Sequence, residues 1–281
     1  MKVLVSGGNG LLARNILPVL GRSFQVFVHD IDEWDITIPS SNKKFLELYH
    51  PDAVLNCAAM TDVDACEDAR EMAYRVNAQG PGILAGSCAN AGIYLVHIST
   101  DYVFDGKAQR PYRENDEPNP VSIYGRTKLA GERFLFEEQS QAAVLRTQWL
   151  YGKGGTSFVS KVVKLARENG SVNVVNDQVG SPTYARDLAE PIIKIIQNKL
   201  TGIYHASNSG STTWFDFARE IFALLDMNVP MSPITTSELG RKAHRPPYSV
   251  FDLSKLERMT GIKMRPWRDA LREYLGSGDV Q

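Results

Sequence analysis

The chain has 281 residues and a formal net charge of −1, with 43% hydrophobic and 22% charged residues. This composition is typical of a globular enzyme, and the length suffices for one large α/β domain and a smaller lobe. The near-zero charge gives no support for nucleic-acid binding. No signal segment or membrane-spanning stretch is recognisable, and three cysteines without Cys-x-x-Cys spacing favour a reduced, cytoplasmic protein.

The first predicted strand, residues 2–6, leads directly into a glycine-rich turn and a helix. The turn reads Gly7-Gly8-Asn9-Gly10-Leu11-Leu12-Ala13. Small residues let the backbone approach a ligand closely, and the start of the helix favours a pyrophosphate. The spacing departs from the strict G-x-G-x-x-G, and an ordinary glycine-rich turn is the alternative. Because it opens a βαβ pattern, we expect it to bind a dinucleotide.

The next two predicted strands, residues 25–28 and 53–56, add further candidates for the cofactor site. Asp30 follows the first of them, where a carboxylate can bond a ribose 2′-hydroxyl and repel a 2′-phosphate, so it favours NAD(H). A solvated loop carboxylate is the alternative. Small residues after the second strand would admit a cofactor: Cys57, Ala58, Ala59, Met60 and Thr61. The acids that follow fit the first turn of a helix better than a metal site: Asp62, Asp64, Glu67 and Asp68.

The fourth predicted strand, residues 94–98, delivers Thr100 and Asp101 to the same sheet edge as the glycine turn. After a polar loop at 106–120, Ser122 can cap a helix that carries Tyr124 and Lys128 on one face. An ammonium near a phenol lowers the pKa of the phenol towards neutral pH, so this pair predicts proton transfer to a carbonyl, with the Thr100 hydroxyl beside it. A Tyr-x-x-x-Lys pair is also common on solvated helix faces.

A fifth strand at 143–147 completes an alternation that predicts an α/β fold with a Rossmann-type doubly wound parallel sheet. We expect residues 1–150 to form an NAD(P)-binding domain and residues 151–281 to form mainly a smaller α/β substrate lobe, with a helix near 186–198 able to rejoin the first domain. Within 151–281, helices are predicted at 158–168, 214–225 and 253–260, and strands at 172–175 and 204–206. His205 is expected to be a packed core residue. Arg245 lies in a basic loop that either binds phosphate or is a solvated turn.

Five motifs together resemble the dTDP-4-dehydrorhamnose reductase family of the extended short-chain dehydrogenase/reductase superfamily. They cover nearly the whole chain: Ser99-Thr100-Asp101-Tyr102-Val103-Phe104-Asp105-Gly106, Tyr124-Gly125-x-Thr127-Lys128-Leu129-x-Gly131-Glu132, Arg146-Thr147-x-Trp149-x-Tyr151, Asp177-Gln178-x-Gly180-x-Pro182-Thr183 and Arg245-Pro246-Pro247-x-Ser249. The resemblance implies reduction of the C4 ketone of dTDP-4-dehydro-6-deoxy-L-mannose with NADPH or NADH. The product would be dTDP-L-rhamnose, for cell-surface polysaccharide synthesis.

The resemblance also implies roles for individual residues. Tyr124 would be the general acid, Lys128 would hold the nicotinamide ribose and lower the pKa of Tyr124, and Thr100 would bond the developing alkoxide. Implied cofactor contacts are Gly7, Gly10, Leu11, Leu12, Asp30, Asp35, Ile36, Ala58, Ala59, Met60, Thr61, Tyr124 and Lys128. Implied substrate contacts are Thr61, Thr100, Asp101, Tyr102, Tyr124, Trp149 and Arg245.

Two departures from the family pattern bear on assembly and function. Leu11 stands where the family often has Gln, and Asn15 stands where some members use an acidic residue to dimerise through Mg²⁺. A homodimer is therefore left open, while a metal-bridged one is not expected. The alternatives are another nucleotide-sugar epimerase or reductase, or a non-catalytic NADP-binding regulatory subunit. A dehydratase is disfavoured because Asp101-Tyr102, not an Asp-Glu pair, follows Thr100.

Overall fold

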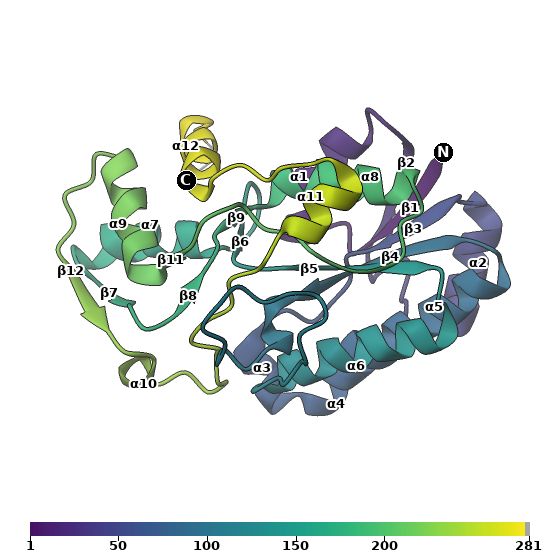
Figure 1. The fold of residues 1–281 in the computed structure, drawn as a ribbon, viewed down its shortest axis with the longest axis horizontal. Helices are drawn as coiled ribbons and strands as arrows, with labels where there is room; N and C mark the ends of the chain where they lie inside the picture. Colours follow the sequence, from purple (N-terminus) through teal and green to yellow (C-terminus); the bar gives the residue numbers. More distant parts are fainter. Residues whose placement is uncertain (279–281) are drawn as a thin grey trace.

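The computed structural model describes residues 1–278, and its centre is a six-stranded parallel sheet (Figure 1). In spatial order the strands are β10 (Gly202–His205), β5 (Ala142–Thr147), β4 (Tyr94–Thr100), β3 (Ala53–Asn56), β1 (Lys2–Ser6) and β2 (Gln25–His29). The order reverses at β1, which lies between β2 and β3. In such a sheet a crevice opens at the carboxyl ends of the strands beside the reversal. The predicted doubly wound parallel sheet is confirmed.

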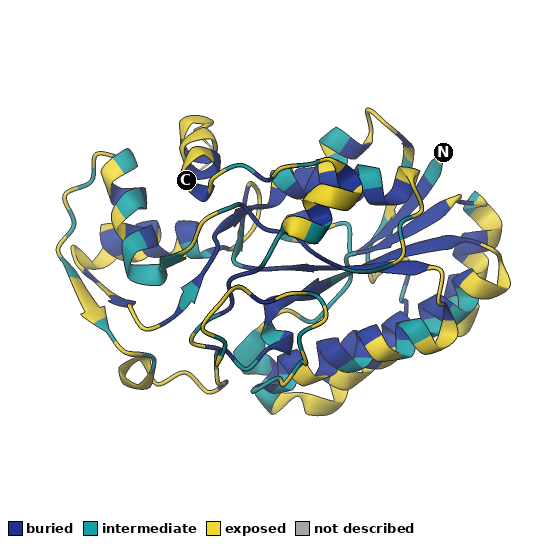
Figure 2. Ribbon diagram, in the orientation of Figure 1, coloured by how far each residue is buried: buried dark blue, intermediate teal, exposed yellow. Residues whose placement is uncertain are grey.

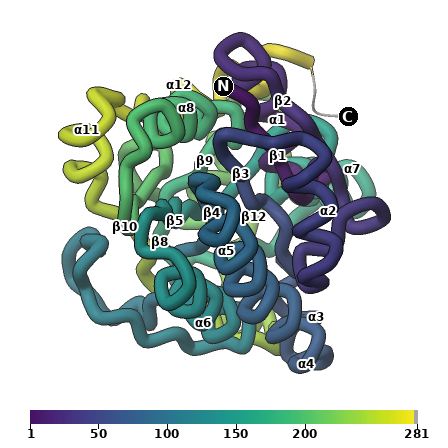
Figure 3. Tube along the Cα trace, turned by 90° about the vertical axis from the view of Figure 1, so that its right-hand side faces the viewer, coloured from purple at the N-terminus to yellow at the C-terminus, as the bar shows by residue number. Residues whose placement is uncertain are grey.

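Helices cover both faces of this sheet. One face carries α1 (Leu11–Leu20), α8 (Ala189–Gln197) and α11 (Ser254–Thr260); the other carries α2 (Pro39–Tyr49), α5 (Gly80–Asn90) and α6 (Ile123–Glu138). Figure 3 shows α1 and α8 on one side of the strands and α5 and α6 on the other. With both faces covered, the strands are apolar on both sides, which explains their continuous hydrophobic runs. Figure 2 shows β1, β3, β4 and β5 buried, whereas the edge strand β2 is partly exposed.

The helical segment before β4 is divided into shorter elements. Here α3 (Val63–Asp68) and α4 (Arg70–Tyr74) lead into a π-helical turn at Arg75–Gln79, and α5 continues from Gly80. Pro81 lies in the first turn of α5, where a missing backbone N–H is tolerated, so it does not break the helix.

A second lobe is packed beside the sheet around its own apolar core. Its helices are α7 (Phe158–Asn169), α9 (Trp214–Leu224), α10 (Thr236–Leu239) and α12 (Trp267–Gly276). Its short strands pair two by two: β7 (Val172–Val175) with β12 (Met231–Ile234), β8 (Val179–Gly180) with β11 (Thr212–Thr213), and β6 (Leu150–Tyr151) with β9 (Thr183–Tyr184). The sequence did not indicate α10, α12 or β12.

Between two passes through the second lobe, the chain returns to the central sheet. The helix expected near 186–198 is present as α8, and its apolar side chains pack against α1. The strand that follows, β10, pairs with β5 and forms the edge of the sheet. Within residues 1–278, no helix has both the length and the apolar character needed to cross a bilayer.

A buried ion pair ties α6 to the centre of the sheet. Arg146 on β5 donates to Glu132 through Nε at 2.9 Å and through Nη2 at 2.6 Å, and both side chains are almost fully buried. Ser99 at the end of β4 donates to the same carboxylate at 2.5 Å. Two parallel hydrogen bonds between a guanidinium and a carboxylate fix both position and orientation. The pair therefore sets where α6 lies relative to the ends of β4 and β5.

Removing the Glu132 carboxylate would leave the buried Arg146 guanidinium without an opposite charge. We therefore expect Glu132→Ala to lower the free energy of unfolding by roughly 3–5 kcal/mol. The control is Glu47→Ala, which removes the exposed Lys43–Glu47 pair and should change stability by less than about 1 kcal/mol. Urea unfolding of both variants checks this, and equal effects would contradict it.

Candidate functional site

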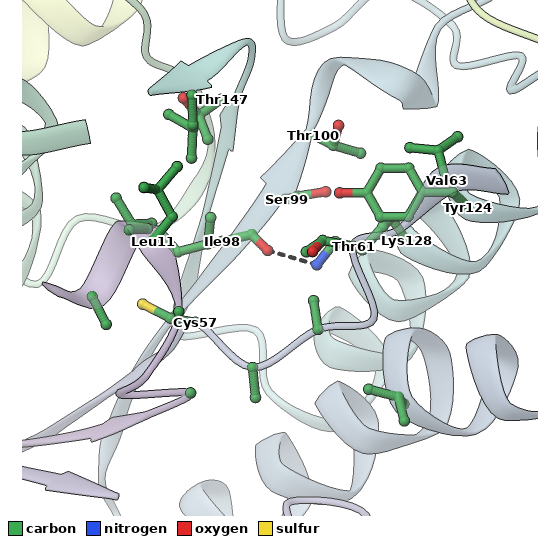
Figure 4. A pocket seen from close by; sticks show the side chains of 18 of the residues that line it. Leu11, Cys57, Thr61, Val63, Ile98, Ser99, Thr100, Tyr124, Lys128 and Thr147 are labelled. Carbon is green, nitrogen blue, oxygen red and sulfur yellow. Dashed lines mark hydrogen bonds between the residues drawn. The ribbon is translucent and has the colours of Figure 1, made fainter. Parts of the chain in front are cut away.

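A cleft of about 690 Å³ opens at the carboxyl ends of β1, β3, β4 and β5. Its walls are the segments that follow these strands and β2, together with the first turn of α1 and the first two turns of α6 (Figure 4). The second lobe adds Thr156, Phe158 and Trp214. The sequence did not indicate these three residues, because nothing in their local pattern shows that their lobe folds back over the sheet edge.

Most of the predicted site residues line this one cleft. They are Gly7, Gly10, Leu11, Leu12, Asp30, Asp35, Ile36, Ala58, Ala59, Thr61, Thr100, Asp101, Tyr102, Tyr124, Lys128 and Trp149. Met60 and Arg245 are not among the lining residues. The backbone of Met60 is held from behind by Asn77 in the π-helical turn, which donates to its carbonyl and accepts from its N–H. Asn77 is therefore a partner of the loop backbone beside the cleft.

The glycine turn is shaped for close approach of the backbone. Gly7 has φ +71°, and a Cβ there would lie 2.7 Å from the backbone nitrogen of Ala58. After Gly10, α1 begins without a side-chain cap, so no side chain satisfies the N–H groups of its first turn. Uncapped N–H groups at a helix start, with the positive end of the helix dipole, suit a phosphate group. These residues therefore fit the pyrophosphate of a dinucleotide.

Asp30 is fixed at the edge of this cradle. Its carboxylate accepts from the backbone N–H of Asn9 at 2.6 Å and of Ile31 at 2.7 Å. Among the residues that line the cleft, Lys128 on α6 is the one basic side chain. The Asp30 carboxylate is fixed in position and has no basic residue of the cleft wall beside it, so it suits a ribose 2′-hydroxyl better than a 2′-phosphate.

Tyr124, Thr100 and Lys128 meet at the inner end of the cleft (Figure 4). Ser122 caps α6 as expected, accepting from the N–H of Gly125. The Tyr124 phenol is hydrogen-bonded to Thr100. The Lys128 ammonium nitrogen bonds the Ile98 carbonyl at 2.7 Å. These contacts bring the hydroxyl groups of Tyr124 and Thr100 to one point, where both can face a substrate oxygen.

The predicted lowering of the Tyr124 pKa is wrong for the cofactor-free protein. Burial raises the pKa of Tyr124 well above its usual value, and the hydrogen bond from Thr100 only partly opposes this. Burial also lowers the pKa of Lys128 to about 8. Sequence spacing places the two side chains on one face but does not show how far that face is shielded from water, and here desolvation and the neighbouring Asp101 carboxylate raise the pKa of Tyr124. The raised pKa keeps the phenol protonated, which is the form a proton donor needs.

Asp101 is a buried carboxylate beside this group. Thr100 donates to its Oδ1 at 3.0 Å, while its Oδ2 has no hydrogen-bond partner among the described residues. Burial raises the pKa of Asp101 to about 6. The Ser249 side chain also interacts with this carboxylate. Because Asp101 lines the cleft, its carboxylate can still accept a hydrogen bond from a ligand hydroxyl.

The acids after β3 hold the basic loop of residues 241–245, not a metal. Asp64 accepts from Arg245 Nη2 at 2.9 Å and from the Ala243 N–H at 3.0 Å, and Asp68 pairs with Lys242. Arg245 is also hydrogen-bonded to Tyr102, which lines the cleft. Arg245 thus acts on the cleft through Tyr102. No group of three or more potential metal-ligating side chains is found within residues 1–278.

Asn15 is committed to contacts inside the chain. Its amide donates to the Leu11 carbonyl at 2.7 Å and to the Lys153 carbonyl at 3.0 Å, and accepts from the Lys153 N–H at 2.9 Å. Asn15 therefore links the glycine turn to the loop that leaves the sheet after β6. His205 is buried as expected, with Nδ1 3.0 Å from the Tyr112 carbonyl and its ring stacked on Phe251.

Two stacked indoles form the wall between the sheet and the second lobe. Trp149 and Trp214 have ring centroids 3.4 Å apart and nearly parallel planes. Trp149 has φ +47°, a left-handed conformation that is uncommon for an aromatic residue. Gly180 lies so close beneath the indole that a Cβ there would be 2.4 Å from Trp149 Cε2. Such strain at a cleft is typical of a functional position.

Comparison with known proteins assigns the chain to a family. The RmlD substrate binding domain family model matches residues 1–279. A dTDP-4-dehydrorhamnose reductase from Streptomyces griseus is 40% identical, over 96% of this chain and 91% of the relative. The chain belongs to the dTDP-4-dehydrorhamnose reductase family. Another relative, a probable dTDP-4,6-dihydroxy-2-methyloxan-3-one 4-ketoreductase from Streptomyces antibioticus, is 41% identical over 97% of this chain and 94% of its own length.

Solved structures of the family agree with this fold throughout. A dTDP-4-dehydrorhamnose reductase from Clostridium acetobutylicum matches with a TM-score of 0.95 and 43% identity, covering 99% of both chains. The Bacillus anthracis dTDP-4-dehydrorhamnose reductase, solved in complex with NADP, matches with a TM-score of 0.94 and 38% identity, covering 98% of this chain and 99% of that one. The expected family, Rossmann-type fold and oxidoreductase class are confirmed.

The burial of Asp101 predicts a pH-dependent effect on stability. Its pKa is higher in the folded than in the unfolded chain, so the stability present at low pH is lost as the pH rises through about 6. We expect Asp101→Asn to gain about 1 kcal/mol relative to the wild type between about pH 5 and about pH 7.5, since the amide does not ionise. Urea unfolding at both pH values checks this. Asp105→Asn is the control, because the pKa of Asp105 is lowered and its removal should not show this gain.

Proposed function

We propose that this chain reduces the C4 ketone of dTDP-4-dehydrorhamnose to dTDP-L-rhamnose with NADH or NADPH. The observation that carries the proposal is the meeting of the Tyr124 and Thr100 hydroxyls beside Lys128, at the end of a cleft that begins with the glycine cradle. A ketone held between the two hydroxyls would receive a proton from Tyr124 as it is reduced, while Thr100 bonds the same oxygen. The nicotinamide supplies the hydride.

The proposed binding residues divide between the two parts of the chain. The glycine turn, Asp30 and the residues after β3 would hold the dinucleotide, and Lys128 would hold the nicotinamide ribose. Thr61, Asp101, Tyr102 and Trp149 would contact the sugar, with Arg245 positioning Tyr102. We assign cofactor binding to the sheet domain, which takes in α8, β10 and α11, and substrate binding mainly to the lobe formed by the rest of residues 151–278.

The direct test is reduction of dTDP-4-dehydrorhamnose prepared in situ. Loss of reduced-nicotinamide absorbance in proportion to added sugar supports a reductase, and proton NMR of the product at C4 separates L-rhamnose from its C4 epimer. The C4 epimer is an alternative product, because the names of two relatives give reductases that act on different dTDP-sugars. Cofactor binding without oxidation would favour an epimerase or a regulatory subunit.

Tyr124→Phe removes the proposed proton donor and little else. We expect kcat to fall by about 10²–10⁴-fold, with NADH affinity and thermal stability near wild-type values. Tyr151→Phe is the matched control: Tyr151 is also fully buried, and its hydroxyl has no hydrogen-bond partner among the described residues. It should keep wild-type kcat. A Tyr124→Phe variant with wild-type turnover would show that the proton comes from another group.

The Asp30 carboxylate predicts a preference for NADH. We expect Asp30→Asn to raise the ratio of kcat/KM for NADPH to that for NADH by about tenfold, because one like-charge repulsion of roughly 1.4 kcal/mol is removed. Glu33→Gln is the control, since Glu33 is exposed and does not line the cleft. If the ratio is unchanged in Asp30→Asn, Asp30 does not face the 2′ position.

A further inference from the structure

Three buried polar side chains lie in a row behind the cleft and lead to Lys128. Asn56 at the end of β3 has its Nδ2 3.0 Å from His97 Nδ1 on β4, and His97 Nε2 is 3.1 Å from the Lys128 nitrogen. Asn56 and His97 are fully buried, and Lys128 is 2% exposed. Neither Asn56 nor His97 lines the cleft. The proposed reaction uses Lys128 but gives the other two no task.

The backbone N–H of Ala58 determines which atom donates in each hydrogen bond between Asn56, His97 and Lys128. It donates to Asn56 Oδ1 at 3.0 Å, and Ser6 Oγ donates to the same oxygen at 2.8 Å. If the Asn56 amide were flipped, its NH₂ group would face the Ala58 N–H, and two donors would meet. The amide therefore has a single orientation. Asn56 Nδ2 therefore donates to His97 Nδ1, and the proton of the neutral imidazole is on Nε2, which faces Lys128.

This arrangement favours a neutral Lys128. The His97 Nε2–H can donate to the lone pair of an amine, whereas an ammonium would present a second donor to it. Burial lowers the pKa of His97 well below its usual value, so His97 does not become a cation, and burial lowers the pKa of Lys128 to about 8. The other groups that face Lys128 are the Glu132 carboxylate, which is paired with Arg146, the Cys57 thiol, whose pKa burial raises, and the Ile98 carbonyl.

We propose that His97 is a positioning residue that stabilises the neutral amine of Lys128, so that at mildly alkaline pH cofactor binding draws a proton onto those molecules in which Lys128 is uncharged. The proton comes from solvent and converts Lys128 from amine to ammonium; no other bond forms or breaks. The charged Lys128 turns its hydrogens from His97 towards Ile98 and the ribose hydroxyls. The inference rests on the cofactor binding in the proposed function. It explains how Lys128 gains the charge that can then lower the pKa of Tyr124.

Proton uptake on NADH binding tests this without any turnover. Calorimetric titration in two buffers of different ionisation enthalpy gives the number of protons taken up. NADH is used because the 2′-phosphate of NADPH itself titrates near pH 6. With a free pKa of about 8 for Lys128, we expect about half a proton per NADH at about pH 8 and almost none at about pH 6.5.

Two variants separate the His97 bond from burial alone. In His97→Gln the amide can rotate and accept from an ammonium, so uptake at about pH 8 should fall below half the wild-type value. In Asn56→Asp both side-chain oxygens accept, His97 then carries its proton on Nδ1, and Nε2 accepts from the ammonium, so uptake should fall as well. His205→Gln is the matched control, a buried histidine on β10 that bonds the Tyr112 carbonyl and not Lys128. It should keep wild-type uptake.

Each outcome decides one question. Wild-type protein that binds NADH without proton uptake at about pH 8 would overturn the inference and leave the proposed reductase intact. Uptake that is unchanged in both Asn56→Asp and His97→Gln, with thermal melting showing folded protein, would also overturn it. Wild-type protein that does not bind NADH or NADPH would overturn the proposed function itself.

Discussion

The bidentate contact between Glu132 and Arg146 is the constraint on which the site depends. It joins α6 to β5, and through Ser99 it reaches the end of β4. One helical turn before Glu132, the same helix carries Lys128, and a further turn before that it carries Tyr124. The position of both groups relative to Thr100 is therefore set by a pair that never touches a ligand. A buried pair of this kind contributes little net stability but fixes register strongly when its geometry is bidentate.

The strands, the cradle and the side chains at the sheet edge could be predicted because their signals are local. Apolar runs that end in glycine or small residues mark buried parallel strands, and parallel strands bring their carboxyl ends to one edge. The cap at Ser122 and the helical spacing of Tyr124 and Lys128 are equally local. These features account for more than half of the lining that comes from the first 150 residues.

The remaining features could not be predicted because they depend on contacts distant in sequence. Trp214 reaches the cleft only because its lobe packs beside the sheet, and no pattern around it shows this. The sequence around Asp64 and Asp68 does not show that each forms an ion pair with the basic loop, which lies some 180 residues later in the chain. The pKa of Tyr124 depends on how completely the fold excludes water. The helical periodicity of a sequence shows which face of the helix a side chain occupies, but not how far the fold shields that face from water.

The return of the chain to the central sheet has a consequence for biosynthesis. β10 pairs with β5, yet 54 residues, from 148 to 201, are synthesised between them, and most of these belong to the second lobe. At typical elongation rates of about 5–20 residues per second, the outer edge of β5 stays without a partner for about 3–12 s on the ribosome. An unpaired, apolar strand edge is prone to aggregation. Arg146 is the next-to-last residue of β5, so the charge that orders the finished site lies on the same strand whose edge is unpaired during synthesis.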